Sequence, residues 1–327
     1  MKRYTVLIFL IVSLLSQSLL AQNKTRFSVA PSVKYNFGYT EYVMDLIYYD
    51  SDDDEHYRLK SELVFPLDVI MPGVNIGVQS SLNDKIDWSV FAEVYFSANN
   101  PSSKMTDRDW EGPVGGQLIE FSNTESDAEL SAFKFNLRAE KQVLSKSNFD
   151  LYLVLGYEYQ KFDYDIYGYR GWQINDVGAR QNMSDDTVKA LDYEVTYSMP
   201  LFGLAARFNQ TGRTVLNINT EFGPVFVSDL DDHVLRNKIA EASGTGFAVG
   251  ASGNSRFFFN IGSRPRRAFF DLNADIKYIS ASTKQTQKWY GDDPATVDDD
   301  TGSYITNIPH DIKSLQYGIG VKIGMMF

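Results

Sequence analysis

The sequence predicts an all-β protein: a transmembrane, antiparallel up-and-down β-barrel of ten strands that protrudes above the outer membrane. Apolar and polar residues alternate along most of the chain, and aromatic residues are dense, with 20 Tyr and 22 Phe. After residue 21 no apolar run approaches the ~18 residues of a membrane helix. Alternating strands turn one face to lipid and the other to the barrel interior. The chain contains no cysteine, which excludes disulfides and thiol chemistry.

The start of the chain predicts a secretory signal peptide over residues 1–21. Two basic residues precede an apolar run from Tyr4 to about Leu15, and small and polar residues follow up to Ala21. We expect the remaining residues, 22–327, to form one barrel domain.

The C-terminal segment shows the strand pattern most clearly. In YGIGVKIGMMF, residues 317–327, the odd positions are apolar and most even positions are small or polar. The segments 85–96, 149–159 and 268–278 repeat this alternation. A last strand that ends on an aromatic residue, Phe327, is typical of bacterial outer-membrane barrels.

Two classes of connection separate the predicted strands. Short polar turns are expected at 80–85, 144–148, 209–213 and 263–267. Longer stretches rich in Asp, Gly, Ser and Asn are expected to be loops near 49–56, 98–118, 170–186, 232–246 and 290–303. Their alternation gives ten strands, with both chain ends on the periplasmic side. Many strands reach about twice the ~9–11 residues that cross a bilayer, so the barrel should protrude.

Period-two geometry places an acidic group inside the barrel mouth. Along 214–233 the even positions are apolar, so Asp229, Asp231 and His233 should face the interior at the outer end of the seventh strand. The same parity on the third strand carries Asp107 and Asp109 inward, on the roughly opposite wall.

This grouping suits the activation of water. A carboxylate that binds an imidazole holds it in one tautomer and favours its protonated form, which makes a general base near neutral pH. Two neighbouring carboxylates raise one another's pKa, so that one can keep a proton while the other is ionised. A water between the two walls could attack a carbonyl carbon.

These residues, together with GYEYQKFDYD, TYSMPLFGLAARF and TEYVM, resemble the omptin family of outer-membrane endopeptidases over almost the whole mature chain. The resemblance implies that Asp107 and Asp109 are the catalytic carboxylate pair and that Asp231 and His233 are the catalytic dyad. It also implies cleavage next to or between basic residues, a site that faces the cell exterior, and lipopolysaccharide as an activator with no other cofactor or metal.

The resemblance further implies binding roles. Glu41 and Asp229 match the acids that receive the basic residue before the cut, and Tyr157 and Lys161 match lipopolysaccharide contacts. The acid that would receive the residue after the cut is open among three candidates: Glu120, Glu125 and Asp127.

Other functions stay open at this point. A catalytically idle barrel of the same fold would act as an adhesin or structural protein, and a small channel or a lipid-modifying barrel enzyme is a third alternative. The net charge of −11 argues against nucleic acid and favours basic peptides or proteins as partners. His56, in the acidic run 52–56, is interpreted as part of a solvated loop tip, and His310 as structural.

Overall fold

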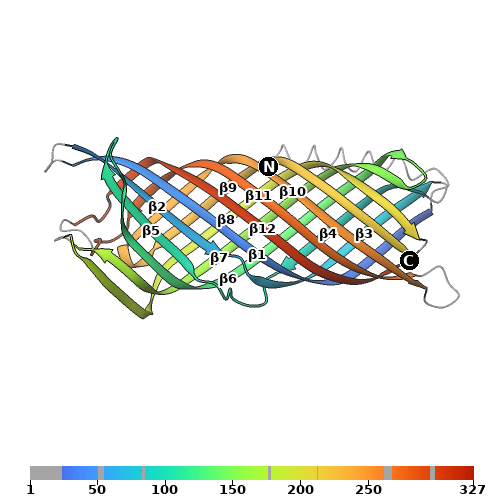
Figure 1. Ribbon diagram of the computed structural model, residues 1–327, viewed down its shortest axis with the longest axis horizontal. Coiled ribbons are helices and arrows are strands. Elements are labelled where there is room, and N and C mark those ends of the chain that lie inside the picture. The colour runs from blue at the N-terminus through green and yellow to red at the C-terminus, as the bar shows by residue number, and fades with distance from the viewer. Residues whose placement is uncertain are drawn as a thin grey trace.

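The protein forms an elongated closed β-barrel (Figure 1). The computed structural model describes residues 24–50, 55–82, 85–175, 178–211, 213–260, 267–294 and 299–327. The predicted signal peptide, 1–21, and the loop acids at 52–54 lie outside the described residues. No helix in these ranges is long and apolar enough to cross a membrane.

In the described ranges twelve β-strands form one antiparallel sheet, and the sheet closes because β1 pairs with β12. The strands are β1 (Lys24–Asp50), β2 (Glu55–Pro66), β3 (Val69–Leu82), β4 (Lys85–Phe96), β5 (Met105–Pro113), β6 (Ile119–Ser145), β7 (Phe149–Ile174), β8 (Arg180–Thr211), β9 (Thr214–His233), β10 (Lys238–Asn260), β11 (Arg267–Trp289) and β12 (Tyr304–Met326).

The ring nevertheless has ten strand positions, as predicted. β3 and β2 are successive parts of one position and both pair with β1, whereas β4 and β5 share the next position and both pair with β6. Figure 1 shows β2 and β5 at one end of the barrel and the C-terminus at the other. β5 therefore belongs to the third position and β9 to the seventh, on roughly opposite walls.

The predicted alternation is confirmed. On β9 the even residues Ile218, Phe222 and Phe226 are exposed, and the intervening odd residues point into the barrel lumen. On β12 Ile319 and Ile323 lie on the same outer belt. This belt of exposed apolar side chains recurs around the ring near the C-terminal end, and we take it as the surface that faces lipid.

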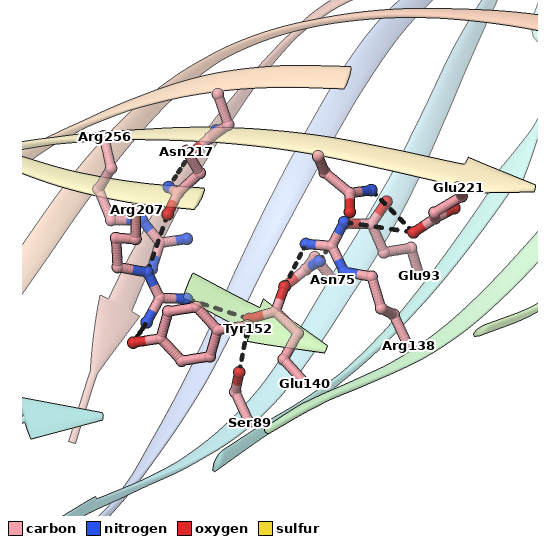
Figure 2. Close-up of polar contacts among 12 residues, drawn as sticks. Asn75, Ser89, Glu93, Arg138, Glu140, Tyr152, Arg207, Asn217, Glu221 and Arg256 are labelled. Atoms are coloured by element: carbon pink, nitrogen blue, oxygen red, sulfur yellow. Dashed lines mark hydrogen bonds and ion pairs between the residues drawn. The ribbon is translucent and has the colours of Figure 1, made fainter. Parts of the chain in front are cut away.

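Inside this belt the lumen is lined by paired charges (Figure 2). Arg207 binds Glu140 at 3.1 Å and Asn217 at 2.9 Å, and Arg138 also binds Glu140 at 3.1 Å. Ser89 donates to the same carboxylate at 2.8 Å. A cavity of about 440 Å³ is lined by four of these residues, Arg138, Glu140, Arg207 and Asn217. Pairing offsets much of the cost of placing charges inside a barrel.

Aromatic rings fill the lumen between this cavity and the far end. Phe65 stacks on Tyr193 with ring centroids 4.2 Å apart, and Tyr164 and Tyr42 pack against the same pair. All four side chains are buried. The rings thus form a packed floor across the lumen, and side chains between this floor and the far end can be held rigidly.

Three of the five predicted long loops are shorter than expected: β5 lies inside 98–118, β7 and β8 extend through most of 170–186, and β10 begins at Lys238 within 232–246. Of this last segment only a 3-10 turn, η2 (Val234–Arg236), and Asn237 connect the strands. The described part of 290–303 connects β11 to β12 without strand, as predicted. Strands that rise above a membrane are solvated, so their composition resembles that of loops.

Candidate active site

The end of β9 carries a carboxylate and an imidazole in direct contact. His233 Nε2 lies 3.0 Å from Asp231 Oδ2; the Asp231 side chain is fully buried and the His233 side chain is 21% exposed. The contact forms because residues two apart share one face of a strand. An imidazole that donates from Nε2 has its lone pair on Nδ1, so His233 can accept a proton there.

The first half of β5 brings two more carboxylates to the same lumen. Asp107 pairs with Leu63 of β2 and Asp109 with Ser61, so the two carboxylates are two residues apart on one face of β5. Burial, with repulsion from Asp109 and Asp231, raises the pKa of Asp107 well above its ordinary value. Burial also raises the pKa of Asp109. The charges of the two walls therefore interact across the mouth, and Asp107 is suited to hold a proton.

Tyr42 of β1 completes the surroundings of Asp231. Its buried hydroxyl donates a hydrogen bond to Asp231 Oδ2, the atom that also contacts His233. Burial would raise the pKa of Asp231, but the interactions with His233 and the Tyr42 hydrogen bond outweigh it and lower that pKa. Asp231 is accordingly held as the anion that orients His233. Sequence reasoning missed Tyr42.

A buried lysine also belongs to this group. Lys238, the first residue of β10, stands in register with His233 and is only 6% exposed. Burial and the nearby Arg236 lower the pKa of Lys238 to about 8, against the attraction of Asp231 and Asp109. Lys238 was missed because the sequence predicted a loop there.

The two acids that the resemblance assigned to a substrate pocket, Glu41 and Asp229, lie on different sides of the barrel wall. Asp229 faces the lumen as predicted, but it is 6% exposed and lies 3.5 Å from His310 Nε2. Glu41 lies on the outer face of β1, between buried Thr40 and Tyr42, and pairs with Lys313 at 3.4 Å. The prediction that Glu41 joins Asp229 is therefore wrong in this structure, because alternation turns position 41 away from the lumen.

The predicted lipid contacts lie on the outer surface of β7. Tyr157 and Lys161 are exposed or partly exposed, four residues apart on one face. The Tyr157 hydroxyl is 3.0 Å from Ser198 Oγ, and Lys161 Nζ is 2.8 Å from Glu194. The face suits a lipid contact, although Lys161 already has an acidic partner.

The three candidate acids for the residue after the cut separate in the structure. Glu125 and Asp127 are exposed on β6, and Asp127 pairs with Lys104 near the rim. Glu120 accepts a hydrogen bond from Asn123 at 3.0 Å. The register of β6 shifts between Ser122, which pairs with Asp109, and Glu120, which pairs with Trp110, so Glu120 shares the face of Trp110 and not that of Asp109. None of the three candidates therefore lies on the lumen face of Asp107 and Asp109.

Comparison with known proteins agrees with this architecture. The Omptin family matches residues 32–302. The chain belongs to the Omptin family. The solved structure of the outer membrane protease OmpT from Escherichia coli matches with a TM-score of 0.68 at 15% identity, over 92% of this chain and 96% of that one.

Other matches are weaker. The outer membrane protein OprG from Pseudomonas aeruginosa gives a TM-score of 0.29 at 11% identity, over 93% of this chain and 97% of that one, and no argument rests on it. No curated protein matches the sequence. The Omptin family and the shared barrel thus identify an outer-membrane β-barrel protein.

Within this omptin barrel, the side chains at the mouth include groups that can exchange protons. Among the described ranges, no group of three or more His, Asp or Glu side chains is arranged to hold a metal ion. What the mouth offers is a base at His233, an anion at Asp231 and an acid at Asp107. Such a set can transfer protons to and from water and an amide.

Proposed function

We propose that this chain is an outer-membrane endopeptidase that hydrolyses peptide bonds with a water held between the two walls of the barrel mouth. Membership of the Omptin family and a fold like that of the outer membrane protease OmpT support a protease. The observation that carries the proposal is the 3.0 Å contact between Asp231 and His233, opposite the carboxylates of Asp107 and Asp109.

The proposed mechanism uses His233 as general base. His233 Nδ1 takes a proton from the water as the water oxygen attacks the carbonyl carbon, and the carbonyl electron pair moves to its oxygen. Protonated Asp107 donates a hydrogen bond to that oxygen, and Asp231 stabilises the imidazolium. His233 then gives its proton to the leaving nitrogen as the C–N bond breaks.

We propose basic peptides or proteins as substrates. A chain with a net charge of −11 attracts cations, and the carboxylates at the mouth concentrate this charge at the site. The proposal extends to lipopolysaccharide as an activator bound on the face of Tyr157 and Lys161. It also places the mouth at the cell exterior, because the site lies beyond the lipid-facing belt, at the end far from the C-terminus.

A cleavage assay with matched histidine variants tests the function. Barrel refolded with lipopolysaccharide should cleave a quenched peptide that contains Arg-Arg, and His233→Ala or Asp107→Asn should reduce kcat/KM by about 10³-fold or more. His56→Ala is the control, because His56 is exposed beside Tyr49 at the start of β2. Equal cleavage by His233→Ala and His56→Ala would exclude the dyad.

The same assay separates the alternatives. Absence of cleavage of every basic peptide by folded wild-type barrel would favour the idle barrel that acts as an adhesin or structural protein. The aromatic floor of Tyr42, Phe65, Tyr164 and Tyr193 argues against a small channel, since it fills the lumen below the site. Cleavage of an impermeant peptide by intact cells would place the mouth outside.

A further inference from the structure

The segment that follows β11 binds the turn between the histidine of the dyad and Lys238. In that turn Asn237 has a left-handed backbone, with φ at 48°. Its side-chain amide donates to the backbone carbonyl of Asp292 at 2.7 Å, and its own carbonyl accepts from the backbone N–H of Tyr290 at 2.9 Å. The Tyr290 hydroxyl also donates to Asp232 Oδ1 at 2.9 Å. Two segments far apart in the chain are thus joined next to the dyad, by contacts that the proposed mechanism does not use.

Asp293 is the buried charge of the segment after β11. It is 1% exposed, and its Oδ2 accepts hydrogen bonds from Arg236 Nε at 3.1 Å and from Trp289 Nε1 at 3.3 Å. A buried carboxylate is tolerated where hydrogen bonds and an opposite charge compensate its lost hydration. One oxygen therefore fixes both a guanidinium of η2 and an indole of β11.

Both partners of Asp293 adjoin Lys238. The Lys238 Nζ lies 5.8 Å from the centroid of the Trp289 ring, within the range of a cation–π contact. Arg236 precedes Lys238 by two residues, and its charge repels the lysine. Lys238 in turn pairs with the histidine of the dyad across β9 and β10, and it attracts Asp231. The contacts of Asp293 therefore determine what surrounds the lysine beside the dyad.

We propose that Asp293 is a positioning residue of the active site: it fixes Arg236 and the Trp289 ring, and these hold Lys238 beside the dyad. Asp293 acts through these side chains and not on the substrate. The Arg236 side chain is 49% exposed, and an ion pair open to water contributes little to stability, so a purely structural role explains the pair poorly. The inference rests on the proposed function and deepens it.

Asp293 also contributes to the charge around Lys238. The titratable groups that face Lys238 come from every neighbouring element: Asp231 and His233 on β9, Asp107 and Asp109 on β5, Arg236 on η2, and Asp293. Burial and Arg236 lower the pKa of Lys238 to about 8, and Asp293 is one of the acids that oppose this. Without the Asp293 charge, Lys238 loses an attracting anion and meets an uncompensated Arg236, so its pKa falls. As pH rises, the lysine then loses its charge at a lower pH than in wild type.

Two adjacent aspartates provide a matched pair of variants. Asp293→Ala releases both Arg236 and Trp289, whereas Asp292→Ala removes an exposed side chain and keeps the backbone carbonyl that Asn237 binds. We expect kcat/KM at pH 7 to fall by about 10-fold in Asp293→Ala and by less than about 2-fold in Asp292→Ala. Equal activity of the two variants would overturn the proposal.

The pH profile separates positioning from a general loss of structure. In Asp293→Asn, which keeps an acceptor oxygen but not the charge, the alkaline fall of kcat/KM should begin roughly one pH unit lower than in wild type. Arg236→Gln in the same background removes the uncompensated repulsion, so the double variant should return toward the wild-type profile. A wild-type profile or a uniform loss at every pH in Asp293→Asn, or a double variant no better than Asp293→Asn, would reject the role.

Hydrogen exchange tests the same contacts without cleavage. The backbone N–H of Tyr290 donates to Asn237, so its exchange reports whether the segment holds the turn. Exchange in 234–238 and 289–293 should be at least about 10-fold faster in Asp293→Ala than in Asp292→Ala, and equal rates would refute the inference. If wild type cleaves no peptide, the proposed function fails, and the exchange rates still decide whether Asp293 fixes this turn.

Discussion

At the scale of single residues, the site depends on how neighbours divide the charge among four acids. Two hydrogen-bond donors lower the pKa of Asp231 and stabilise its anion. The pKa of Asp107 is raised, which favours its neutral form. The opposite directions follow from contacts: Asp231 touches His233 and Tyr42, and Asp107 faces other carboxylates. Separated pKa values in one cluster allow one acid to orient the base and another to donate a proton.

Tyr42→Phe tests the stabilisation of Asp231. Because the hydroxyl lowers the pKa of Asp231, its loss raises that pKa, and on acidification the ionised form is lost at a higher pH. The acid limb of the kcat/KM profile should move up by roughly 1–2 pH units. The control is Tyr48→Phe, which removes another tyrosine hydroxyl of β1. That hydroxyl bonds to Glu111 of β5, so its loss should leave the acid limb in place.

Lys238 gives a second, alkaline signature. Its cation attracts the Asp231 anion, which orients His233, and so helps to keep the pKa of Asp231 low. Lys238→Met should therefore reduce kcat/KM at pH 7, on the order of 10-fold. A lysine loses its charge as pH rises through its pKa, here about 8, so the difference from wild type should vanish above that pH. Lys238→Arg keeps its charge and should stay active above pH 8. If the loss of kcat/KM in Lys238→Met is the same from pH 6 to 10, an electrostatic role is rejected.

At the scale of elements, the position of β5 depends on a latch at the break between β2 and β3. Asp68 Oδ2 accepts backbone N–H groups of Ser102 at 2.8 Å and Ser103 at 3.1 Å. These residues belong to the connection that leads from β4 into β5. The latch therefore holds the start of the strand that carries Asp107 and Asp109.

Asp68→Ala should release this latch. Ser102 and Ser103 are exposed, so each lost hydrogen bond costs only about 0.5–1.5 kcal/mol, and β5 should lose its fixed position before the barrel unfolds. We expect kcat to fall by about 10-fold and hydrogen exchange to increase in 97–113. Asp127→Ala, which removes an exposed ion pair with Lys104 at the same rim, should change neither. Equal exchange in the two variants would argue against the latch.

The period-two alternation explains which of these residues could be placed from the sequence. Parity along β9 placed Asp229, Asp231 and His233 correctly, because a period-two pattern with one buried face has a single register. The same rule applied to β1 would predict Tyr42 inside; Glu41 was assigned by motif instead. His310 was taken as structural, since nothing local in the sequence shows that β12 brings it to Asp229.

At the scale of the whole molecule, the barrel has two zones along its axis. The belt of exposed apolar residues surrounds the paired charges of Figure 2, and the carboxylates of the mouth lie beyond it. On β9 the belt extends to Phe226. Leu230 lies on the same face, four residues nearer the mouth, and is 37% exposed. The site is thus solvated from one end only, which suits the hydrolysis of peptides that arrive from that side.

Two arginine substitutions on one strand measure where the bilayer ends. Phe222→Arg places a charge on the belt at a side chain that is 63% exposed, and it should reduce the free energy of unfolding in vesicles by about 2–4 kcal/mol. Leu230→Arg, on the same face nearer the mouth, should cost only about 0–1 kcal/mol because the cost falls toward the interface. Urea titration gives both values. Equal losses would mean that lipid reaches Leu230, and the solvated mouth proposed for Asp231 and His233 would then be untenable.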